Sequence, residues 1–171
     1  SKVEMLLLCT QSPDYFLPTT ACILQHKLGL EKSCGAMDYN LGCSGYIYGL
    51  SLAKGMIESG QVNNVLLVTT ETYSKYINEK DHSVKPLFGD GATATFVEAV
   101  DTDIPGLDGF VFGTDGSGFE NLIVPAGGMV HPYGTVNIEE EADEYGNVRT
   151  ASNIHMKGSA ISDFALEVVP D

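Results

Sequence analysis

The fold is decided by residues 35–60, GAMDYNLGCSGYIYGLSLAKGMIESG. The first part, Gly35–Asn40, predicts a short and centrally buried strand. After the turn Gly42-Cys43-Ser44-Gly45, apolar side chains recur at helical spacing to about Ser59. Gly60 then stands where glycine is favoured just past the end of a helix. A strand that turns at once into a helix indicates an α/β fold.

Further strand and helix signals flank this unit. Val3–Thr10 is a short apolar run, typical of a buried strand. Thr19 or Thr20 can cap a following helix, which Gly29 closes. Asn64–Thr70 predicts a third strand, apolar on both faces. Strands and helices that alternate in this order predict a parallel sheet covered on both sides.

The rest of the chain is richer in Gly and Pro turns. We expect strands at Ala92–Val100, Phe110–Gly113 and Leu122–Val124. The acidic run Glu139–Glu144 is predicted to be a solvated loop, with no basic partner segment. Lys157–Val169 has the apolar spacing of a last helix.

The composition is that of a soluble globular domain. The 171 residues suffice for one domain with a core, and 43% are hydrophobic while 19% are charged. No apolar run approaches the roughly 18 residues of a membrane span. The net charge of −14, with only nine scattered Lys and Arg residues, argues against nucleic acid, because phosphate binding needs clustered cations. We therefore expect neither a membrane nor a nucleic-acid partner.

The four cysteines, Cys9, Cys22, Cys34 and Cys43, lack the spacing of a zinc site, and the first residues do not have the pattern expected of a secretory leader. Free thiols survive in a reducing compartment, so we expect a cytoplasmic protein without a metal. The first three are interpreted as packing residues in a strand, on a helix face and in a loop.

Cys43 differs because it stands where the strand turns into the helix. Unpaired N–H groups and the positive dipole end of a helix stabilise a thiolate there. The flanking glycines allow a sharp turn and the close approach of a carbonyl, and the Cys43 N–H could serve an oxyanion hole, as in a nucleophile elbow. The alternative is a small buried cysteine that packs at the helix start, and position alone does not choose between the two.

Sulfur at such a position suits transfer of an acyl group that arrives as a thioester. Exchange of one thioester for another is nearly thermoneutral and leaves the acyl carbon reactive toward a carbon nucleophile. Carbon–carbon bond formation is therefore a natural outcome for a nucleophile at Cys43.

Five motifs occur in the order and spacing of 3-oxoacyl-[acyl-carrier-protein] synthase III, the thiolase-fold condensing enzyme that starts fatty-acid chains. They are CTQSPDY at Cys9–Tyr15, PTTAC at Pro18–Cys22, GCSGY at Gly42–Tyr46, VLLVTTE at Val65–Glu71 and LFGDGA at Leu87–Ala92. A weaker match continues to Phe164–Pro170. The resemblance implies that residues 1–171 are a single thiolase-like half-domain, with a mixed, largely parallel sheet covered by helices. Its first strand and helix, and the whole C-terminal half, would then be missing.

The resemblance also implies a reaction. Cys43 would take an acyl group from coenzyme A, and a carbanion from malonyl-[acyl-carrier-protein] would then attack it with loss of CO2. No cofactor is implied; acyl carrier protein and coenzyme A thioesters are the partners. Family enzymes are homodimers, and the resemblance places Asn64–Thr70 at the subunit interface as a strand that pairs with the partner.

Four further residues follow from the resemblance as substrate-binding. Leu17 would close the partner's acyl tunnel. His82 stands near where some relatives place an Arg that stacks on the adenine of coenzyme A, although a solvated turn at Asp81-His82 is the favoured alternative. Phe88 and Gly89 fall in or beside a loop near the active site.

The catalytic His and Asn of the family lie beyond the matched region. None of His26, His82, His131 and His155 fits the motif of the catalytic His. Three related activities therefore stay open: a 3-hydroxy-3-methylglutaryl-CoA synthase, a long-chain head-to-head condensing enzyme and an ester-forming acyl transferase. A non-catalytic partner subunit is a further alternative, against which the intact Gly-Cys-Ser-Gly setting argues.

Overall fold

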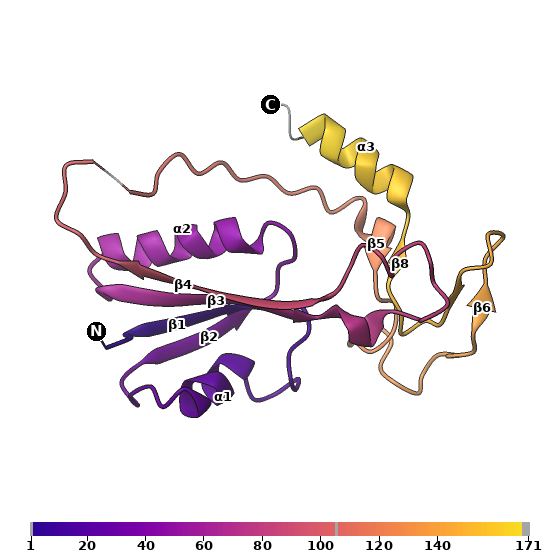
Figure 1. The fold of residues 1–171 in the computed structure, drawn as a ribbon, viewed down its shortest axis with the longest axis horizontal. Helices are drawn as coiled ribbons and strands as arrows, with labels where there is room; N and C mark the ends of the chain where they lie inside the picture. The colour runs from indigo at the N-terminus through magenta and orange to yellow at the C-terminus, as the bar shows by residue number, and fades with distance from the viewer. Residues whose placement is uncertain (1, 105, 169–171) are drawn as a thin grey trace. The chain divides into compact units, whose positions relative to one another are not determined.

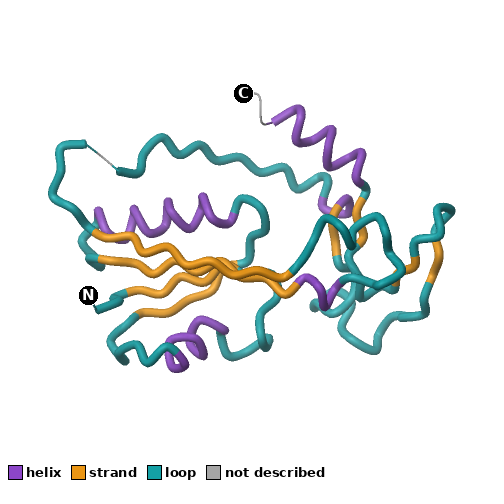
Figure 2. Tube along the Cα trace, in the orientation of Figure 1, coloured by secondary structure: helices purple, strands orange, loops and turns teal. Residues whose placement is uncertain are grey.

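The computed structural model describes residues 2–104 and 106–168, which divide into two compact units. The first unit comprises Ser1–Thr72 and Asp90–Phe112, and the second comprises Tyr73–Gly89 and Gly113–Asp171. Figure 1 shows the elements of both units, and Figure 2 shows where helix, strand and loop alternate along the chain.

The first unit is built on a four-stranded sheet of order β2-β1-β3-β4. Its strands are β1 (Met5–Cys9), β2 (Gly35–Tyr39), β3 (Asn64–Thr72) and β4 (Asp90–Glu98). The first three are parallel and β4 is antiparallel to β3, which confirms a mixed, largely parallel sheet. The prediction that β2 is central was wrong, because it lies at the edge of this sheet, with the residues along it only partly buried or exposed.

Two helices cover opposite faces of the sheet (Figure 1). Successive residues of a strand point to opposite faces, and β1 uses both. Leu6 and Leu8 are fully buried in a cluster with Ala21 of α1 (Thr20–Lys27). Leu7, equally buried, packs in a second cluster with Ala53 of α2 (Gly45–Glu58). The continuous apolar run of β1 is therefore explained by burial on both sides.

Helix α1 is capped by a residue from the neighbouring strand. Thr19 stands at the cap position, as predicted, but its side chain makes no capping hydrogen bond. Instead, the carboxylate of Asp38 on β2 accepts the backbone N–H of Thr20 at 2.7 Å and that of Ala21 at 2.6 Å. Gly29 follows the helix with a φ of 65°, the left-handed conformation expected of a closing glycine.

Two expectations about strands were wrong. Strand β3 pairs with β1 on one side and with β4 on the other, so it has no free edge with which to pair a partner subunit. The structure assigns no strand to Phe110–Gly113. The ring of Phe112 instead packs on that of Tyr48, with centroids 4.9 Å apart.

The second unit consists mostly of turns and short elements. It contains the 3₁₀ helices η1 (Tyr73–Tyr76) and η2 (Phe119–Asn121), the antiparallel pairs β5 (Leu122–Ile123) with β8 (His155–Met156) and β6 (Glu141–Ala142) with β7 (Val148–Arg149), and helix α3 (Gly158–Val168). The predicted strand at Leu122–Val124 is present as β5, and the predicted last helix is present as α3. Val169, the last residue of that prediction, lies outside the described residues.

Candidate active site

Cys43 lies in the turn that joins β2 to α2, two residues before the helix begins at Gly45. Because β1, β2 and β3 are parallel, their carboxyl ends meet at this edge of the sheet, where open α/β sheets bind ligands. The Cys43 side chain is exposed. The interpretation of Cys43 as a buried packing residue is therefore wrong, and its role as a nucleophile stays a prediction.

The turn is not a strained elbow. In the described residues only glycines have positive φ, and neither Gly42 nor Gly45 is among them. The backbone N–H of Gly45 donates to the Gly42 carbonyl at 2.9 Å, which closes a regular turn. Gly45 is required for a different reason: an added Cβ would overlap the sulfur of Cys9 beneath it.

Two side chains from the strands support this turn from below. The Cys9 thiol donates to the carbonyl of Leu41 at 3.1 Å. The Tyr39 hydroxyl donates to the carbonyl of Gly45 at 2.7 Å. Burial raises the pKa of the Cys9 thiol and also that of the Tyr39 hydroxyl, so both keep their protons at neutral pH.

A chain of polar contacts links the ends of the three parallel strands. The Glu71 carboxylate, on β3, accepts the Gln11 N–H and the Ser12 hydroxyl, each at 2.8 Å. The Gln11 side chain donates to that of Asn40 at 3.1 Å. Glu71 ends the motif Val65–Glu71, but no role was predicted for its side chain. Its position at the end of an apolar strand, beside those of Gln11 and Asn40, is the signal that could have found it.

Leu17 lies in the loop between β1 and α1, after Tyr15 and Phe16. These three side chains are 63%, 71% and 82% exposed in chain order. The peptide bond from Leu17 to Pro18 is cis. Three consecutive exposed apolar side chains are a feature of surfaces that bind another molecule.

The other predicted substrate-binding residues belong to the second unit. His82 is exposed, and its backbone N–H donates to the Asn147 side chain at 3.1 Å. Phe88 is half-buried, and its ring meets that of Tyr73 edge-on, with centroids 5.6 Å apart. Gly89 is exposed, and no atom lies within 4 Å of where its Cβ would be.

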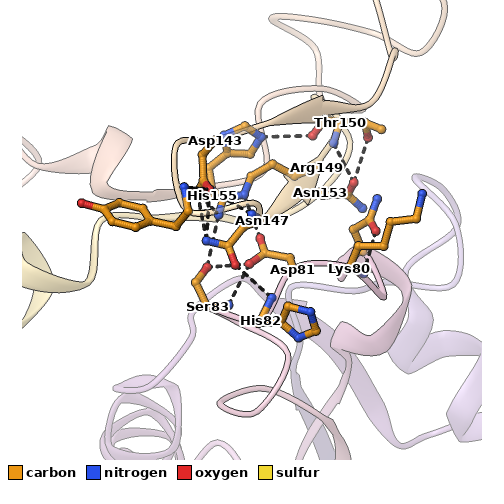
Figure 3. A network of polar contacts seen from close by, with 12 residues as sticks. Lys80, Asp81, His82, Ser83, Asp143, Asn147, Arg149, Thr150, Asn153 and His155 are labelled. Atoms are coloured by element: carbon orange, nitrogen blue, oxygen red, sulfur yellow. Dashed lines mark hydrogen bonds and ion pairs between the residues drawn. The ribbon is translucent and has the colours of Figure 1, made fainter.

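Asp81, next to His82, is fully buried at the centre of a polar network (Figure 3). Its carboxylate accepts Nε of Arg149 at 2.7 Å and the hydroxyl and backbone N–H of Ser83 at 2.5 and 3.0 Å. Arg149 also donates to Asp143 at 3.1 Å. The interpretation of Asp81-His82 as a solvated turn is therefore wrong for Asp81.

The acidic run also has basic partners, contrary to the prediction. Glu140 accepts the Lys80 ammonium group at 2.8 Å, and Asp143 pairs with Arg149. The run is mostly exposed, as predicted, but it is not all loop, because Glu141–Ala142 forms strand β6.

Within residues 2–104 and 106–168, no three His, Cys, Asp or Glu side chains are grouped so that they could hold a metal ion. In the same part of the chain, no helix combines the length and the apolar composition needed to cross a bilayer.

Known proteins resemble this chain in both sequence and fold. Residues 37–116, which contain Cys43, match the family described as 3-oxoacyl-[acyl-carrier-protein (ACP)] synthase III. A solved 3-oxoacyl-(acyl-carrier-protein) synthase III superposes with a TM-score of 0.96 and 52% identity, covering 99% of this chain and 50% of that one. By sequence and by fold, this chain is a relative of 3-oxoacyl-[acyl-carrier-protein] synthase III. The predicted thiolase-like α/β fold is thereby confirmed.

Two further relatives match a similar share of this chain, at lower identity. The beta-ketoacyl-[acyl-carrier-protein] synthase III of Caldanaerobacter subterraneus is 40% identical over 98% of this chain and 47% of its own. A solved 3-oxoacyl-(acyl-carrier protein) synthase from Burkholderia xenovorans LB400 has a TM-score of 0.82 and 39% identity, with 99% and 46% covered. The chain thus spans about half the length of the synthase III relatives that it matches.

Proposed function

We propose that the chain is the first half-domain of a beta-ketoacyl-ACP synthase III-type enzyme, and that Cys43 accepts the acyl group. The half-domain would lack the family's first strand and helix and its C-terminal half. One observation carries the proposal: the Cys43 thiol is exposed at the start of α2, at the carboxyl edge of parallel strands. Similarity to solved synthase III structures over 99% of the chain supports it.

The first step would be thioester exchange. The Cys43 thiolate attacks the carbonyl carbon of acyl-CoA, a new S–C bond forms, and the bond from that carbon to the coenzyme A sulfur breaks. Coenzyme A leaves as a thiolate and takes up a proton. No cofactor is consumed, because the acyl carbon is already activated.

The second step would be a decarboxylative condensation. The malonyl group on acyl carrier protein loses CO2, and the electron pair of the broken C–C bond attacks the carbonyl carbon of the Cys43 thioester. The S–C bond then breaks, which returns the Cys43 thiolate and yields a 3-oxoacyl thioester. The His and Asn that would assist decarboxylation are expected in the remaining half of the protein.

A homodimer would complete this site. The exposed apolar segment Tyr15–Leu17 supports a subunit contact in which Leu17 limits the partner's acyl tunnel. Among the described strands of the sheet, β2 and β4 are the outermost, so a second subunit could extend the sheet at either of them.

Coenzyme A would contact the second unit. His82, Phe88 and Gly89 are proposed for this role because His82 and Gly89 are exposed and Phe88 offers part of an aromatic face. A cytoplasmic location is proposed because all four cysteines are free thiols.

The test is to incubate the full-length protein with acyl-CoA and to measure its intact mass. We expect one acyl adduct, which is lost in Cys43→Ala and kept in Cys22→Ala, a matched exposed cysteine on α1. An adduct that survives Cys43→Ala contradicts the proposal. The absence of any adduct also contradicts it and favours a non-catalytic subunit.

A second assay separates the related activities. With malonyl-ACP as extender, we expect release of CO2 together with a 3-oxoacyl product. A 3-hydroxy-3-methylglutaryl-CoA synthase would instead condense acetoacetyl-CoA without releasing CO2, a head-to-head enzyme would prefer two long-chain thioesters, and an ester-forming transferase would need an alcohol.

A further inference from the structure

Two donors from the sheet, the buried Cys9 and the partly buried Tyr39, hold the carbonyls on either side of the Cys43 turn. The Cys9 thiol, from the end of β1, binds the carbonyl of Leu41, two residues before Cys43. The Tyr39 hydroxyl, from the end of β2, binds the carbonyl of Gly45, two residues after it. Neither donor belongs to the turn itself, so the contacts tie the turn to the sheet.

The fit between the helix and these two groups is tight. A Cβ at Gly45 would overlap the Cys9 sulfur, and a Cβ at Gly49 would overlap the Tyr39 hydroxyl. Cys9 is only 3% exposed. The first five residues of α2 therefore lie directly on the two donors, and glycines at these two positions make the close approach possible.

Both groups stay protonated under the conditions in which they must donate. Burial is the main cause that raises the pKa of the Cys9 thiol, and the Glu71 carboxylate adds to it. Burial also raises the pKa of Tyr39, with the neighbouring Cys9 thiol as a further cause. A thiolate at Cys9 or a phenolate at Tyr39 would be unable to bind a carbonyl oxygen.

We propose that Cys9 and Tyr39 are positioning residues, which set the orientation of the Cys43 thiol through the carbonyls of Leu41 and Gly45. In a planar trans peptide the C=O and the following N–H point in opposite directions. Holding the Leu41 carbonyl on Cys9 therefore directs the Gly42 N–H away from Cys9. A nucleophile misplaced by about 1 Å can lose about a hundredfold in rate, so restraints of this kind matter for a thiol on a turn. The inference rests on the proposed function of Cys43.

The test compares variants of the full-length protein that remove one donor each. We expect Tyr39→Phe and Cys9→Ala to slow acylation of Cys43 by acyl-CoA about tenfold, with KM unchanged. Cys9→Ser keeps a donor to the Leu41 carbonyl and should stay within about twofold of wild type. Loss of packing alone would not be rescued in this way.

Two matched controls define the background. Cys34 is also a buried cysteine, but its thiol donates to the Gly35 carbonyl at 3.3 Å, away from the Cys43 turn. Tyr46 is on α2, and its hydroxyl pairs with that of Thr95. Cys34→Ala and Tyr46→Phe should acylate at the wild-type rate. Equal slowing in Cys34→Ala, or wild-type rates in both Tyr39→Phe and Cys9→Ala, would overturn the proposal.

A chemical probe separates this proposal from the proposed function. The pH profile of Cys43 alkylation by iodoacetamide reports the surroundings of the thiol whether or not acyl-CoA is a substrate. We expect the profile to change in Tyr39→Phe and Cys9→Ala and to match wild type in Cys9→Ser and Cys34→Ala. If wild type forms no acyl adduct, the proposed function fails, and the alkylation profiles still decide the roles of Cys9 and Tyr39.

Discussion

Nε of Arg149 donates to the carboxylate of Asp81 at 2.7 Å, although 68 residues separate the two in the chain. The Asp81 side chain is 1% exposed and that of Arg149 is 17% exposed. The pair joins the turn that contains His82 to strand β7 within the second unit (Figure 3). This unit has a small core, with Val84, Ala126 and Ile154 among its buried apolar residues, so one buried ion pair carries unusual weight.

Removing the cation should therefore destabilise the protein strongly. Arg149→Met leaves the Asp81 charge buried with fewer partners, and such changes cost about 3–5 kcal/mol. The measurement is the free energy of unfolding in urea. Lys80→Met is the matched control, because its pair with Glu140 is at least half exposed on both sides and should cost less than about 1 kcal/mol. Equal losses in the two variants would show that the buried pair has no special role.

The same pair predicts a dependence on pH. Burial opposes ionisation of Asp81, but hydrogen bonds from Ser83 and Arg149 outweigh it, and its pKa lies below the ordinary value of 3.8. A depressed pKa in the folded state contributes stability above the unfolded pKa, and this is lost as the pH falls through the folded value. The stability difference between wild type and Asp81→Asn should thus shrink from pH 6 toward pH 3. A difference that grows on acidification would contradict the assignment.

Two glycines of α2 should respond in opposite ways to the same substitution. In Gly49→Ala the new Cβ would meet the Tyr39 hydroxyl and lie 2.6 Å from a methyl carbon of Leu67, so we expect a loss of about 1–3 kcal/mol. In Gly55→Ala nothing lies within 4 Å of the Cβ, and helix propensity should add about 0.5–1 kcal/mol. Thermal unfolding of the two variants tests this close packing of α2 on the sheet. Stabilisation of both variants would contradict it.

The start of α1 offers another matched pair. Asp38→Ala removes a carboxylate that accepts two backbone N–H groups, and loss of a helix cap costs about 1–2 kcal/mol. Thr19→Ala, at the cap position itself, removes a side chain that makes no capping hydrogen bond. It should cost only a few tenths of a kcal/mol. The free energy of unfolding in urea distinguishes the two variants. A larger loss of stability in Thr19→Ala would mean that Thr19, and not Asp38, caps the helix.

The elements around Cys43 were predictable because their signals are local. The apolar runs of β1 and β3 and the glycines after both helices depend on neighbouring residues alone, and Gly29 and Gly60 do have positive φ. The motifs around Gly42–Tyr46 also gave the fold by resemblance. The sequence alone thus predicted the sheet, both of its helices and the position of the candidate nucleophile.

What could not be predicted depends on contacts between distant residues. Asp38 caps a helix that starts 18 residues earlier, and Asp81 finds Arg149 across 68 residues. The edge position of β2 follows from strand order, which a single apolar run does not encode. The support from Cys9 and Tyr39 was equally hidden, since a buried cysteine is ordinarily only a packing residue. The strands β6, β7 and β8 and the two 3₁₀ helices of the second unit have too few residues for any periodic signal.

The last prediction concerns His82, whose proposed role is to contact coenzyme A. Its backbone N–H is held by Asn147, while its side chain is exposed, so His82→Ala should leave the turn and the melting temperature unchanged. Lost contact with the nucleotide should raise KM for acyl-CoA about threefold to tenfold, with kcat nearly constant. His82→Arg should restore or lower KM, because a planar guanidinium stacks on aromatic rings and pairs with phosphates.

An acyl donor without the nucleotide separates binding from chemistry at this position. Transfer from an acyl-pantetheine thioester should proceed equally in wild type and His82→Ala, since the portion that His82 would contact is absent. If His82→Ala slows both donors to the same degree, the side chain acts on the reacting centre or on the fold. If it slows neither, the side chain is only part of a solvated surface, and coenzyme A must be recognised elsewhere.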